Sequence, residues 1–293
     1  ALDAVLGTSV SESRLPIVLF LTDGIPSVGE QEPDRIAAAA AGRIGRARIF
    51  TIGVGPDVNT YLLDRLAKEG RGAAEYVAPE ANVEAVVGAL VAKLRRPALV
   101  NLRIVDSPVR LVGLSPAQLP DLFYGEELVV FGRYQGTGRG TVVIEGERNG
   151  RRERFTAEAS FPSTENGNDF IPKLWASRRI GDLSRQIRLE GPSDALIREV
   201  RDLGLRHGIL TEYTSYLVQE PGLVAVRRDG PMMDMQGFGN ASAAPVAAQA
   251  PAAQTGEQAF RRSRESGKMS GTASLADADA VAEEKFVALG GGG

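Results

Sequence analysis

The sequence predicts an α/β chain that opens with a partial, Rossmann-like parallel sheet and helices and continues into antiparallel β-structure. Strand-like and helix-like segments alternate from Leu15 to Leu94, a pattern typical of parallel sheets with right-handed crossovers. From Pro97 onwards, short β-type runs follow one another with turn residues between them. We expect a partial parallel α/β domain over residues 1–96, a sandwich-like β-rich domain over 97–168, a helical segment with a closing strand over 169–222, and a disordered tail over 223–293.

The predicted parallel sheet begins with Ile17–Leu21, a continuous apolar run of the kind found in strands that are covered on both faces. Further strands are expected at Ala47–Val54 and Ala74–Val77. Apolar residues at helical spacing predict the helices that alternate with these strands, which are Asp34–Arg46, Asn59–Lys68 and Val83–Leu94.

The β-rich region contains short runs separated by turn signals such as QGTGRG and ERNGRR, which predicts an antiparallel sandwich. The expected strands are Ala98–Val105, Val109–Leu114, Glu127–Tyr134, Thr141–Glu147 and Arg152–Ala159. Helices follow at Ile171–Leu189 and Asp194–Leu203, and then a turn and a strand within Arg206–Glu220. After Pro221 the composition becomes rich in Ala, Pro, Gln, Gly and Ser, which predicts disorder.

The composition excludes several classes of partner and site. A formal net charge of −3 is too small to indicate a nucleic acid or a membrane surface as partner. The chain has no cysteine, which rules out disulfides and thiolate metal sites. Its one histidine, His207, precludes a site built on several imidazoles, and its place beside Gly208 suggests a helix-end or exposed side chain. No apolar run approaches the roughly 20 residues that cross a bilayer.

Motifs for the common catalytic sites are also missing from the sequence. There is no G-x-S-x-G nucleophile elbow and no phosphate-binding loop of the G-x-x-x-x-G-K-[ST] type. The glycines at Gly53 and Gly55 lack the third glycine of a dinucleotide fingerprint. We therefore expect a chain without enzymatic activity.

Asp23 is the candidate metal ligand. Open α/β sheets bind their ligands at the carboxyl ends of the strands, and Asp23 directly follows the most apolar strand. A carboxylate between the hydroxyl of Thr22 and the small Gly24 suits a hard divalent cation such as Mg²⁺. The alternative is that Asp-Gly forms a turn which Asp23 only caps. From this tripeptide alone, the turn is the favoured interpretation.

The wider constellation resembles a known family. VLFLTDGIPSVGE, followed by RIFTIGVGPDVNTYLLDRLAKEGRGAAEYV, resembles the second half of a von Willebrand factor A (vWA) domain. With the later LGLRHGILTEYTSYLV, the pattern is similar to inter-alpha-trypsin inhibitor heavy chains and their bacterial VIT/vWA relatives, over roughly Leu15–Glu220. The resemblance implies a metal-ion-dependent adhesion site in which Asp23 reaches the metal through water. Its D-x-S-x-S loop and threonine have no counterpart here.

The resemblance implies a non-enzymatic, metal-dependent protein-binding or adhesion module of an exported protein, whether periplasmic, cell-surface or secreted. We expect the chain to be truncated at its N-terminus, so that the metal site is incomplete and Mg²⁺ binds weakly or not at all. The expected partners are a protein ligand offering an acidic side chain and the missing N-terminal part of the same protein. The alternatives are a vWA subunit that works beside an ATPase in metal insertion or protein remodelling, and a structural role with the β-sandwich as the working surface.

Overall fold

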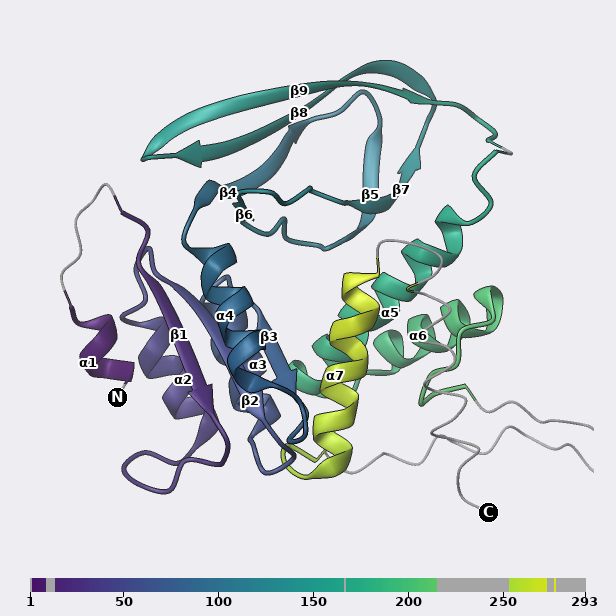
Figure 1. Ribbon diagram of the computed structural model, residues 1–293. Coiled ribbons are helices and arrows are strands. Elements are labelled where there is room, and N and C mark those ends of the chain that lie inside the picture. The colour runs from purple at the N-terminus through teal and green to yellow at the C-terminus, as the bar shows by residue number, and fades with distance from the viewer. Residues whose placement is uncertain (1, 9–13, 166, 215–252, 273–276, 278–293) are drawn as a thin grey trace, which may run out of the picture.

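The computed structural model describes residues 2–8, 14–165, 167–214, 253–272 and 277. Figure 1 shows a parallel sheet with its helices and a group of antiparallel strands above it. Beside them lie helices α5 (Ile171–Glu190), α6 (Asp194–His207) and α7 (Glu257–Gly271). The predicted α/β class is confirmed. Among the described residues, no helix has both the length and the apolar character needed to cross a membrane.

The parallel unit is a three-stranded sheet in the order β1-β2-β3 with helices on both faces. Its central strand β2 is almost entirely buried, and Ile49 contacts Leu62 and Leu66 of α3. Phe50 points to the opposite face, where it packs with Leu94 of α4. The elements are α1 (Leu2–Leu6), β1 (Ile17–Thr22), α2 (Pro33–Ala41), β2 (Arg48–Val54), α3 (Thr60–Glu69), β3 (Ala74–Val77) and α4 (Val83–Leu94).

Helix α2 is shorter than the sequence predicted. It ends at Ala41, and the backbone N–H of Gly42 closes its last turn on the carbonyl of Ala38. Gly45 then adopts a φ of 51°, a left-handed conformation that cannot continue a right-handed helix. The predicted extension to Arg46 is therefore wrong, because an alanine-rich pattern does not show where a glycine breaks the helix.

The β-rich unit consists of two antiparallel sheets, one with the strand order β6-β4-β8-β9 and one with the pair β5-β7. Strand β7 begins at Phe131, whereas the predicted strand began at Glu127. Leu128 and Val130 lie before β7 but pack on the cluster around Leu99, so their apolar character reflects packing and not strand pairing. The strands are β4 (Pro97–Asp106), β5 (Arg110–Ser115), β6 (Leu122–Phe123), β7 (Phe131–Gln135), β8 (Gly138–Arg148) and β9 (Arg151–Phe161).

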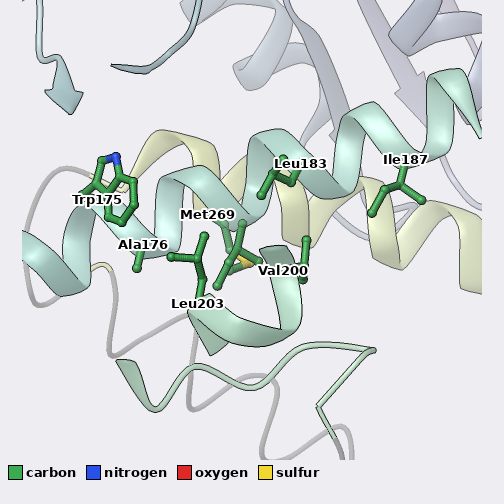
Figure 2. Packing of buried hydrophobic residues seen from close by; sticks show 8 residues of the cluster. Trp175, Ala176, Leu183, Ile187, Val200, Leu203 and Met269 are labelled. Atoms are coloured by element: carbon green, nitrogen blue, oxygen red, sulfur yellow. The ribbon is translucent and has the colours of Figure 1, made fainter. Parts of the chain in front are cut away.

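Helices α5 (Ile171–Glu190), α6 (Asp194–His207) and α7 (Glu257–Gly271) form a separate apolar cluster. Figure 2 shows side chains of α5 and α6 meeting Met269 of α7 in this cluster. The labelled members are Trp175, Ala176, Leu183, Ile187, Val200, Leu203 and Met269.

Helix α7 corrects the prediction of a disordered tail over residues 223–293. Its buried face carries Ala259, Phe260 and Met269 among serines, so the average composition hides an amphipathic helix. Most of the remaining tail lies outside the described residues. The same holds for residues 215–220 of the predicted closing strand. Before them, α6 ends at His207, followed by Gly208 in the left-handed conformation.

Helix α5 contacts both sheet units. Near its beginning, Trp175 Nε1 donates a hydrogen bond of 2.7 Å to the carbonyl oxygen of Gly113 in β5. Near its end, Arg188 forms an ion pair of 2.9 Å with Asp64 of α3, and both side chains are largely buried. The hydroxyl of Tyr76 also lies 3.0 Å from Asp64, and burial raises the pKa of this tyrosine well above its usual value. The helix therefore connects the parallel and antiparallel units.

Candidate functional site

The loop after β1 forms a tight turn at the carboxyl edge of the parallel sheet. The Thr22 hydroxyl donates to the carbonyl of Gly24 at 3.0 Å and accepts from the backbone N–H of Gly24 at 3.3 Å. Thr22 therefore makes the hydrogen bonds of this turn, for which the sequence had suggested Asp23 as the cap. The side chain of Asp23 is exposed to solvent at the same turn.

Asp23 is a poor metal ligand by itself. Within the described part of the chain, no three or more Asp, Glu, His or Cys side chains lie close enough together to hold a metal ion. Mg²⁺ takes six oxygen ligands, and a single exposed carboxylate leaves all but one of them to water. The described residues therefore do not form a metal centre by themselves.

A pocket of about 340 Å³ lies at the same edge of the sheet. Strand β1 and the loop after it form one wall, and α2 and the beginning of α3 form the other. Asn59 lies at the beginning of α3, where its side-chain oxygen caps the helix by accepting a hydrogen bond from the backbone N–H of Leu62 at 2.9 Å. The pocket wall includes Phe20, Thr22, Gly24, Ile25, Val28, Asn59 and Leu63.

Two apolar side chains project into solvent at this pocket. Ile25 and Val28 both line it and are 58% and 90% exposed, respectively. We call these two residues the apolar rim. Single exposed apolar residues are ordinary, but a group at the mouth of a pocket is typical of a surface that binds another molecule. The acidic loop was expected from the sequence, whereas the rim was not, although both of its residues lie in the IPSVG segment.

The charges around the pocket are mixed and do not suggest catalysis. Glu30 accepts hydrogen bonds from the backbone N–H groups of Glu32 and Gln31, and these bonds lower the pKa of its carboxyl, with help from Arg35. Glu30 and Arg35 form an exposed ion pair of 3.7 Å. This arrangement keeps Glu30 ionised and fixes the loop, whereas an acid catalyst needs a raised pKa.

A larger cleft of about 700 Å³ opens at the other end of the sheet, between the amino ends of β1 and β2 and the antiparallel unit. Its lining is rich in arginine and includes Arg14, Arg46, Arg71 and Arg95. This cleft could not be predicted from the sequence, because its residues come from several separate segments. We take the carboxyl edge as the candidate site, since open parallel sheets bind ligands there.

No protein-family model matches the chain. Human inter-alpha-trypsin inhibitor heavy chain H6 is 29% identical over 234 residues, which cover 73% of this chain and 18% of that protein. A von Willebrand factor A domain-containing protein of Dictyostelium discoideum is 29% identical over 216 residues, covering 71% and 23% respectively. Mouse inter-alpha-trypsin inhibitor heavy chain H3 is 25% identical over 226 residues, covering 73% and 25%.

The chain thus spans a quarter or less of the length of these curated relatives. Among solved structures, a von Willebrand factor type A protein from Catenulispora acidiphila aligns with a TM-score of 0.44 and 16% identity, over 71% of this chain and 58% of that one. The predicted resemblance to vWA proteins of the inter-alpha-trypsin inhibitor heavy chain kind is confirmed by the sequence relatives.

Proposed function

We propose that this chain, which resembles vWA proteins of the inter-alpha-trypsin inhibitor heavy chain kind, is part of a non-enzymatic protein-binding module. The proposed binding surface is the carboxyl edge of the parallel sheet. The observation that carries the proposal is the apolar rim of Ile25 and Val28 at a pocket of about 340 Å³. Such a surface fits a protein ligand that inserts one side chain into the pocket and covers the rim.

The rim supplies the favourable free energy of this contact. Full burial of a leucine, isoleucine or valine side chain is worth about 1.5–3 kcal/mol, and Val28 exposes most of its surface before binding. The loop is already held by Thr22 and Glu30, so little conformational entropy is lost when a ligand docks. The contact is therefore proposed to be mainly apolar, with the ion pair of Glu30 and Arg35 at its margin.

Metal dependence belongs to the longer protein in this proposal. Asp23 would contribute one water-mediated contact to a Mg²⁺ ion whose other ligands come from outside the described residues, and an acidic side chain of the ligand would complete the site. This chain by itself is proposed to bind its ligand without metal. We further propose that the intact protein is exported, as expected from its resemblance to the heavy chains.

The proposal is tested by cross-linking from the rim. A photoreactive amino acid placed at Val28 is expected to capture a specific protein in extracts of the source organism. The control is the same amino acid at Leu205, an apolar residue of α6 that is also exposed, at 56%. The captured partner is then purified, and its affinity for the chain is measured by biolayer interferometry.

Charged substitutions then show whether the rim carries the binding. Ile25→Asp and Val28→Asp are each expected to lower the affinity for the purified partner by about tenfold or more. Each substitution removes about 1.4 kcal/mol or more of favourable apolar burial. Leu205→Asp should leave the affinity unchanged. Equal capture from Val28 and Leu205, or equal loss of affinity in all three variants, would contradict the proposed surface.

A further inference from the structure

The segment from residue 253 to residue 272 docks along one side of the parallel unit. Figure 1 shows α7 running beside α5, with its first turn at the end of the sheet where the strands finish. Its contacts include α5, β3 and α3, which belong to parts of the chain that are distant in sequence. The segment therefore fills a groove built by other elements.

The beginning of this segment caps α3. The carbonyl oxygen of Gln254 accepts from the backbone N–H of Thr60 at 2.9 Å and from the Thr60 hydroxyl at 3.1 Å. Two residues later, the N–H of Gly256 donates to the carbonyl of Pro56 at 3.0 Å. The first N–H groups of a helix have no partner within the helix, so Gln254 satisfies a donor that α3 cannot satisfy itself. Asn59, the neighbouring cap residue, lines the pocket at the candidate site.

The first turn of α7 also supports the wall of that pocket. Phe260 is 3% exposed and belongs to one apolar cluster with Val58, Leu63 and Tyr76, and its ring meets that of Tyr76 edge-on at 6.0 Å. Phe20 packs against the same cluster. Because Phe20 and Leu63 also line the pocket, the side chain of Phe260 lies behind the surface that a ligand would touch.

The rest of α7 is held by close backbone contact with α5 and by the buried side chain of Arg178. A Cβ atom at Gly181 of α5 would lie 2.8 Å from the backbone of Ser266 and Ser270, so only glycine permits this contact. Arg178 is buried and donates to the carbonyls of Thr272 and Gly271 at the end of α7, where a cation also complements the helix dipole. Serines make up much of the remaining interface. With few large apolar side chains, such an interface favours reversible docking.

We propose that residues 253–272 are an internal ligand of this groove and that their docking is coupled to the candidate binding site. The coupling is positive. The docked segment caps α3 beside Asn59 and supports Phe20 and Leu63, and no residue of the segment lines the pocket. Undocking therefore loosens the pocket wall and lowers affinity for a ligand. Conversely, a ligand that fixes the wall favours docking of α7. The effect on ligand affinity rests on the proposed function, whereas the effect on the wall does not.

The test compares two glycine-to-alanine substitutions in the full chain by hydrogen exchange. Both Gly181→Ala and Gly88→Ala replace a helical glycine, which favours the helix locally. Only the first creates a clash with α7, since a Cβ at Gly88 meets nothing within 4 Å. Gly181→Ala is expected to raise amide exchange about tenfold or more in residues 253–272 and also in residues 58–63. Gly88→Ala should leave both regions unchanged.

A second variant, Phe260→Ala, removes the apolar anchor without introducing a clash. It should raise exchange in the same two regions, and a synthetic peptide of residues 253–272 added in excess should restore protection of residues 58–63. Faster exchange of α7 with unchanged exchange of residues 58–63 would overturn the coupling. Unchanged exchange of α7 in both variants would overturn reversible docking. These measurements need no partner protein, so they stand or fall separately from capture at Val28.

Discussion

Arg48 and Asp121 form a buried ion pair between the two sheet units, with Arg48 Nε donating to Asp121 Oδ2 at 2.5 Å. The side chains are 4% and 3% exposed, respectively. Arg48 lies in the central strand of the parallel sheet, and Asp121 precedes β6 of the antiparallel unit. Asn101 joins the pair from β4, because its side-chain oxygen accepts from Arg48 at 2.8 Å and its backbone N–H donates to Asp121 at 2.8 Å. The polar groups of this junction therefore satisfy one another.

We expect Asp121→Ala to lower the free energy of unfolding by about 3–5 kcal/mol, because it leaves the Arg48 guanidinium buried without its counter-ion. Urea denaturation followed by circular dichroism measures the change. The double variant Arg48→Met/Asp121→Leu should recover much of the loss, since no charge then remains buried.

The exposed pair of Arg148 and Glu153 provides the control for this prediction. Its atoms are 3.5 Å apart and its side chains are 48% and 37% exposed, so Glu153→Ala should cost less than about 1 kcal/mol. Equal losses in Asp121→Ala and Glu153→Ala would contradict a structural role for the buried pair.

The parallel unit could be predicted from sequence because its signals are local. Ile17–Leu21 is continuously apolar, and the predicted helices Asn59–Lys68 and Val83–Leu94 match α3 and α4 to within one residue at each end. The junction of Arg48 and Asp121 could not be predicted, since its partners are separated by 73 residues and each alone resembles a surface charge. Whether a charge is buried depends on tertiary packing, which a local sequence pattern does not reveal.

Helix α7 and the candidate site show the same limit. The sequence placed Asp23 correctly at the end of a strand, but the pocket beside it also needs α2 and α3. In α7, Phe260 and Met269 occur among serines and charges, so the pattern becomes visible only when α5 provides the opposing surface. The low hydrophobicity of this segment predicted disorder. In the folded chain, close packing of α7 against Gly181 of α5 offsets that low hydrophobicity.

The pH dependence of stability near neutrality is expected to come from His207, the one histidine of the chain. Burial, assisted by the charge of Arg206, lowers the pKa of His207 in the folded state. This effect outweighs the stabilisation that a protonated histidine gains at a helix C-terminus. Below about pH 6.5 the unfolded chain is protonated at this residue before the folded chain. The free energy of unfolding should therefore decrease as the pH falls below about 6.5.

The substitution His207→Gln tests this assignment, because glutamine does not titrate. Urea denaturation between about pH 5.5 and 7.5 should give a smaller slope for the variant than for the natural chain. The difference should be greatest at the acidic end of this range. Identical slopes, or a natural chain that becomes more stable on acidification, would contradict the role of His207.

Aggregation is expected to begin at β1. Within the described residues, β1 pairs with β2 on one side, and its other edge has no strand partner. Leu21 is 50% exposed on this strand, and apolar edge strands associate with one another. Leu21→Lys should slow aggregation of the purified chain, as measured by light scattering on heating. The control Val91→Lys lies on helix α4, which offers no strand edge, and should have a smaller effect.

Magnesium binding by this chain is expected to be weak or undetectable by isothermal titration calorimetry. Asp23 offers one exposed carboxylate, and the described residues contain no group of three or more acidic or imidazole side chains that could complete a site. Mg²⁺ is reluctant to give up its water, so a single carboxylate gains too little to hold it. Asp23→Asn should therefore leave the titration curve unchanged. Binding at micromolar or tighter affinity that disappears in Asp23→Asn would show that ligands outside the described residues complete the site.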